Sequence, residues 1–161
     1  MWQELARILA ELITDYQKLK QLNEEKRGVL VLVKLQELER LVRQEEEVVS
    51  AIHRTEKKRQ ELLGRMAKSG IRVSPDMQMD SVWSQCPERQ QRETLYKLHR
   101  MLGRLVDEVQ EAVANNGILV ASALDAVNFR LNQLGGSMVE PAYGSRGQEQ
   151  VSHIKNFDLE V

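Results

Sequence analysis

Hydrophobic residues at the start of the chain recur every three or four positions. This spacing places their side chains in one narrow stripe on an α-helix, which must face an apolar partner. Most residues between them are strong helix formers, and no proline occurs before Pro75. The pattern predicts a long helix over residues 2–33. The stripe is formed by Trp2, Leu5, Leu9, Leu12, Tyr16 and Leu19.

A second amphipathic stretch, less regular, predicts a helix over residues 36–68. Its apolar positions include Leu38, Ile52, Leu63 and Met66. Gly28 is the only local signal for a turn between the two helices, so the pattern leaves the position of that turn open. We interpret the aliphatic run 29–33 as a buried helical segment, because a strand there would have no second strand to pair with.

A segment with two prolines separates this pair from a third helix. Gly70 ends the second helix, and Pro75 and Pro87 bracket a stretch that contains Trp83. Because the large indole ring would be costly to leave in water, we expect Trp83 to close one end of the bundle. Residues 69–87 are therefore predicted to be an ordered linker with a short turn of helix.

Residues 88–134 again lack proline and are amphipathic, which predicts a third long helix. Three consecutive spacings of four break the heptad pattern there and rotate the stripe, so the last turns can face a different partner. Gly135 and Gly136 then end the helix, and we interpret residues 135–161 as a flexible tail. The apolar positions are Leu95, Leu98, Leu102, Leu105, Val109, Val113, Gly117, Val120, Leu124, Val127, Leu131 and Leu134.

These elements predict an all-α fold, an elongated antiparallel bundle of three long coiled-coil-like helices over residues 1–134. Lys plus Arg number 23 and Asp plus Glu 24, so the net charge of −1 offers no basic surplus for nucleic acid. The single cysteine, Cys86, allows no internal disulfide and fits the cytoplasm. The longest aliphatic run is too short to span a bilayer, so we expect no membrane insertion.

No catalytic or metal-binding pattern is found in the sequence. The three histidines lie on separate segments, and phosphate-loop, nucleophile-elbow and HExxH motifs are missing. We expect no enzyme activity, no metal and no cofactor, with carboxylates such as Glu45, Glu46 and Glu47 on solvated helix faces. Binding of an amphipathic helix is the favoured function class. The alternative is a structural coiled-coil adaptor, for example a homodimer, that uses its stripes for self-association.

Two short motifs resemble those of the FlgN family of flagellar export chaperones. The first is an Asn-rich step followed by two aliphatic residues, here Asn116 before Leu119 and Val120. The second is a Tyr-Gly-x-x-Gly motif, which begins here at Tyr143 and Gly144. The resemblance covers nearly the whole chain, although the first two thirds are generic coiled-coil sequence.

The resemblance implies a cytoplasmic chaperone without a cofactor. Its clients would be the hook-filament junction proteins, whose C-terminal helical segment it binds, prevents from assembling prematurely and delivers to the flagellar export apparatus. Tyr143 and Gly144 would dock the loaded chaperone on the export gate. The resemblance also places the first turn near residues 33–36.

The last helix offers a client-binding surface under this hypothesis. The alternative, that its stripe packs on residues 38–52 of the same chain, stays open. Asn115, Asn116 and Gly117 are expected to form a hinge or kink, since glycine weakens a helix. The expected client-binding residues are Ile118, Leu119, Val120, Leu124, Val127, Leu131 and Leu134.

Overall fold

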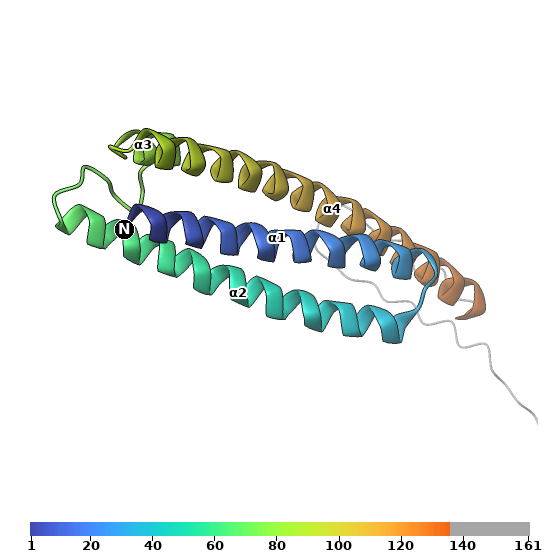
Figure 1. Cartoon of the computed structure of the whole chain (residues 1–161). Coiled ribbons are helices and arrows are strands. Elements are labelled where there is room, and N and C mark those ends of the chain that lie inside the picture. The colour runs from blue at the N-terminus through green and yellow to red at the C-terminus, as the bar shows by residue number, and fades with distance from the viewer. Residues whose placement is uncertain (136–161) are drawn as a thin grey trace, which may run out of the picture. The chain divides into compact units, whose positions relative to one another are not determined.

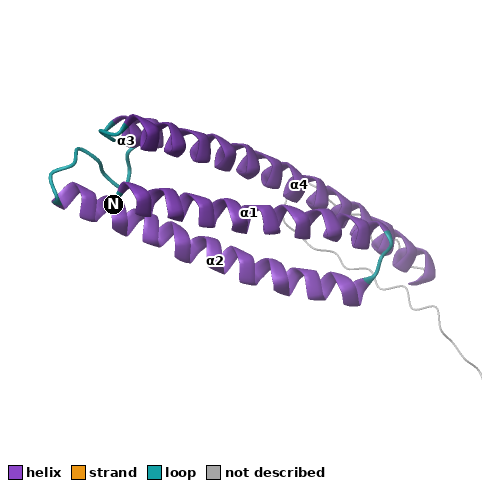
Figure 2. Cartoon of the chain, in the orientation of Figure 1, coloured by secondary structure: helices purple, strands orange, loops and turns teal. Residues whose placement is uncertain are grey.

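The computed structural model describes residues 1–135, and every regular element within that range is an α-helix. Three of these helices are long and one is short, and Figures 1 and 2 show them as coiled ribbons. The predicted all-α bundle is confirmed. The predicted tail, apart from Gly135, lies outside the described residues. The elements are α1 (Trp2–Val31), α2 (Leu35–Lys68), α3 (Met79–Ser84) and α4 (Arg89–Gly135).

Helices α1 and α2 form an antiparallel hairpin (Figure 1). Its turn is closed by backbone hydrogen bonds from the N–H of Val33 to the carbonyl of Leu30, at 3.2 Å, and from the N–H of Lys34 to that of Val29, at 3.1 Å. Val33 adopts a φ of 54°, a left-handed conformation that is strained for a β-branched residue. The turn thus falls at residues 32–34 and overlaps the start of the position implied by the family resemblance.

The prediction of a buried segment at residues 29–33 was wrong. The side chains of Val31, Leu32 and Val33 are each more than 60% exposed, and Leu35 just beyond the turn is 71% exposed. The reason is geometric, because the turn interrupts the helix there and directs these side chains into solvent. Periodicity alone does not reveal this, since it does not locate the end of a hairpin.

Residues 1–119 form one compact unit around a single hydrophobic core. Each long helix contributes a buried stripe at three- and four-residue spacing, as expected for helices that pack lengthwise. Ion pairs between Lys58 and Glu11, at 2.9 Å, and between Arg65 and Glu4, at 2.6 Å, tie α2 to α1 at the surface. The core includes Leu5, Leu9, Leu12 and Leu19 of α1, Ile52, Leu62, Leu63 and Met66 of α2, and Leu95, Leu102, Leu105 and Val109 of α4.

Helix α3 closes one end of this unit with an aromatic cluster. The buried ring of Trp83 lies edge-on to Tyr96, with ring centroids 6.0 Å apart, and 4.7 Å from the ring of His99. Removal from water disfavours the charged imidazolium, so burial holds the pKa of His99 below its ordinary value. The linker thus packs as part of the core.

A second unit begins at Val120, and the structure describes its helical part, the continuation of α4 to Gly135. The helix is unbroken across residues 115–120.

Candidate functional site

The second unit presents a row of exposed aliphatic side chains. We call it the C-terminal stripe, and it consists of Val120, Leu124, Val127 and Leu131. Because an α-helix turns about 100° per residue, these four side chains project within an arc of about 60°. Their exposed fractions run from 41% for Val120 to 59% for Leu131. The predicted partner Leu134 lies in α4, but its side chain is outside the described set.

Two other exposed hydrophobic residues of α4 lie on a different side of the helix. Ile118 and Phe129 project roughly 120–180° away from the members of the C-terminal stripe, by the same helical periodicity. Both are more than 60% exposed. Leu119 is half-buried and projects about 80–140° away from the members of the stripe, by the same periodicity. Helical geometry therefore separates Ile118 from the four residues with which the sequence grouped it.

The Asn-rich step lies inside α4. Helix α4 is continuous through Asn115, Asn116 and Gly117, so none of them caps a helix end. Asn115 is exposed, whereas Asn116 is only 4% exposed and donates a hydrogen bond from Nδ2 to the backbone carbonyl of Asn23, at 2.9 Å. The core position that the sequence analysis gave to Gly117 belongs instead to Asn116. The hinge stays a prediction.

A polar network joins this asparagine to the hairpin. Asn23 is 1% exposed and donates from Nδ2 to Oε1 of Glu45 in α2, at 3.0 Å, while Lys26 pairs with the other oxygen of Glu45. The expectation that Glu45 is solvated was wrong, since its side chain is 19% exposed. One signal was available, because Asn23 follows Leu19 by four residues and so occupies the next position of the α1 stripe.

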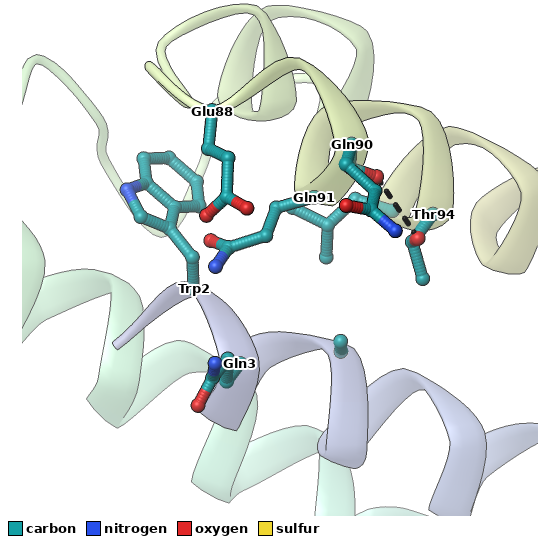
Figure 3. Close-up of a pocket in the computed structure, with 8 residues that line it drawn as sticks. Trp2, Gln3, Glu88, Gln90, Gln91 and Thr94 are labelled. Carbon is teal, nitrogen blue, oxygen red and sulfur yellow. Dashed lines mark hydrogen bonds between the residues drawn. The ribbon is translucent and has the colours of Figure 1, made fainter.

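A cleft of about 340 Å³ lies between the first turns of α1 and α4 (Figure 3). Trp2 forms one wall and stands beside Glu88, with the amide of Gln91 between the helices. Thr94 is occupied within its own helix, since its hydroxyl donates to the backbone carbonyl of Gln90 at 3.0 Å. The lining holds one carboxylate and several neutral amides, which offers no nucleophile paired with a base.

Two kinds of site are absent from residues 1–135, the part of the chain that the structure describes. No three His, Cys, Asp or Glu side chains there come together as a metal site requires. No helix there is long and apolar enough to cross a membrane.

A family model described as FlgN protein matches residues 1–150. No curated protein and no solved structure matches the chain.

Proposed function

The chain belongs to the FlgN family of flagellar export chaperones, and we propose that its clients are the hook-filament junction proteins. It binds the C-terminal helical segment of such a protein, prevents premature assembly and delivers the client to the export apparatus in the cytoplasm. It acts by binding alone, without catalysis or a cofactor.

The observation that carries this proposal is the exposure of the C-terminal stripe. Its four aliphatic side chains lie on one side of a helix and at three- and four-residue spacing, which is the pattern that packs against an amphipathic helix. A junction subunit needs an apolar helical face for its neighbours in the filament, and that face would aggregate if it were released uncovered. The stripe offers a temporary partner for it.

The size of the stripe suits reversible binding. Burying the exposed part of a half-exposed Val or Leu contributes about 1–2 kcal/mol. Four such residues supply several kcal/mol, and ordering the client segment consumes part of that gain. The result is a complex stable enough to protect the client and weak enough to release it.

The docking role of Tyr143 and Gly144 rests on the family resemblance alone, because both residues lie outside the described range. A tyrosine combines a large apolar ring with a polar hydroxyl, which suits an anchor in a small binding pocket. We assign it to the export gate and not to the client.

Hydrogen exchange with purified C-terminal segments of candidate clients tests the proposal. Backbone amides between Gly117 and Leu134 are expected to gain protection when a client segment is added. A scrambled segment of the same composition serves as the control. If no candidate segment protects these amides at saturating concentration, the proposed client-binding surface is wrong.

A structural adaptor is the second candidate, and the hairpin turn favours it. Val31, Leu32, Val33 and Leu35 expose a second group of aliphatic side chains, at the turn between α1 and α2. An adaptor that self-associates through such surfaces would sediment faster as its concentration rises. A chaperone that keeps its surfaces for clients would sediment at one rate throughout.

A further inference from the structure

A buried polar pair lies in the contact between α1 and α4, where a more exposed ion pair also joins Lys20 to Glu108 at 2.9 Å. Asn116 donates from Nδ2 both to the backbone carbonyl of Asn23, at 2.9 Å, and to the side-chain oxygen Oδ1 of Asn23, at 3.3 Å. The two residues are 4% and 1% exposed, so both hydrogen bonds are shielded from water. They join positions that are 93 residues apart in the chain.

Asn23 makes further hydrogen bonds within the hairpin. Asn23 uses its own Nδ2 to reach the carbonyl of Leu19 and Oε1 of Glu45, each at 3.0 Å. Lys26, which also lies in α1, forms an ion pair with Glu45. Among the described residues, no buried side-chain nitrogen or oxygen is left without a partner. The network therefore links all three long helices of the first unit in a single arrangement.

Such an arrangement discriminates between registers. Apolar stripes slide past one another at little cost, since one aliphatic side chain replaces another. If α4 slipped by one turn, a residue such as Val113 would face Asn23, and the side-chain oxygen Oδ1 of Asn23 would stay buried without the donor that Asn116 supplies. A buried asparagine in a helical seam fixes register for this reason, at some expense in stability.

Asn116 also lies near the C-terminal end of the first unit, which ends at Leu119. Leu105 and Val109 are buried, and Asn116 is the last buried residue of α4 among the described side chains. Val120 and Val127 project within about 40° of the direction of Asn116, because an α-helix turns about 100° per residue. By helical periodicity, the exposed residues Val120 and Val127 thus belong to the same stripe of α4 as the buried Asn116.

We propose that the Asn23–Asn116 pair is a positioning device that holds α4 in one register against the hairpin. The pair thereby determines which aliphatic side chains of α4 are consumed by the core and which remain for a client. The second part rests on the proposed function. The first part does not, because register is a property of the free chain.

The test replaces both partners, so that neither is left buried and unpaired. The variant N23L/N116L is compared with wild type and with N115L, which changes the exposed neighbour of Asn116 to the same residue. Amide and methyl spectra report the register through the contacts between α1 and α4. Titration with a client helical segment reports the affinity of the same samples.

In N23L/N116L we expect a melting temperature equal to or above that of wild type. We also expect a second set of α4 resonances, or α1–α4 contacts displaced by one turn, and client affinity at least tenfold lower. N115L should retain one set of resonances and the wild-type affinity.

Each contrary outcome has a defined meaning. A single set of resonances with wild-type contacts in N23L/N116L overturns the register claim, and so does an unfolded N23L/N116L, which would make the pair a requirement for stability. Register heterogeneity with unchanged affinity overturns the link to the client. If wild type itself binds no client segment, the proposed function fails while the register result stands.

Discussion

Truncating the C-terminal stripe should separate client binding from folding. The change is L124A with L131A, two residues that are 57% and 59% exposed in the free chain. Full burial of a leucine side chain is worth about 1.5–3 kcal/mol, so covering the exposed part of each contributes about 1–2 kcal/mol to client binding. The two sites are two turns apart, so their effects should nearly add, and the double variant should bind about 30-fold more weakly or worse.

The stability of the free chain should barely change. Both leucines are already half in solvent, and alanine is the better helix former, so the free energy of unfolding should move by less than about 0.5 kcal/mol. The assay is calorimetric titration of a client helical segment, combined with a urea unfolding curve on each variant.

The matched control is F129A. Phe129 is 63% exposed on the same helix but projects from the other side. Its replacement by alanine removes more apolar area than the replacement of either leucine. The affinity of F129A for the client should stay within about twofold of wild type, since Phe129 is outside the proposed contact. The reasoning is refuted if F129A weakens binding as much as the leucine pair, or if the leucine pair loses less than about threefold.

Three further predictions address the core, the aromatic cluster and the tail. L62A removes a fully buried side chain and should lower the free energy of unfolding by about 2–5 kcal/mol in a denaturant titration. The pKa of His99 is lowered in the folded state, so acid protonates this histidine in the unfolded chain first. The folded state is therefore destabilised as the pH falls below 6.5, the ordinary pKa of histidine. Between pH 7.5 and pH 5, the melting temperature of H99Q should therefore fall less than that of wild type. An equal fall in both proteins would contradict the lowered pKa of His99. Y143A should weaken binding to the export gate while leaving client affinity unchanged, and equal losses in both assays would show that the two roles are not separate.

The sequence determines the buried stripe of α1 because that helix is packed along most of its length. Leu5, Leu9 and Leu12 are spaced for a helical seam and are all buried. The same spacing rule fails at Val31 and Leu35, which continue the pattern but flank the turn and are exposed. Periodicity reports which side of a helix is apolar, and it does not report where the neighbouring helix ends.

The polar network was not predictable by the same rule, since the rule counts only apolar residues. Reading Asn116 as a stripe member gives spacings of four, three and four from Val109 through Val113 to Val120. That reading is as regular as the one through Gly117, and burial decides between them. A polar residue at a seam position becomes informative once its partner is known, and here the partner is 93 positions away.

The candidate site was predictable as a set of residues but not as a surface. Helical spacing groups Val120, Leu124 and Val127 without any structure. Their exposure is a tertiary property, which helical spacing does not report. Family resemblance supplied the kind of client, which no physical feature of the stripe specifies by itself.

Both tryptophans of the chain lie at the same end of the first unit, Trp2 in the wall of the cleft and Trp83 in the aromatic cluster. Tryptophan fluorescence consequently reports on that end of the unit and not on the hairpin turn. Fraying that starts at the strained turn would reduce the circular dichroism signal before it altered the indole emission. A gap between the two melting curves would measure how independently the two ends come apart.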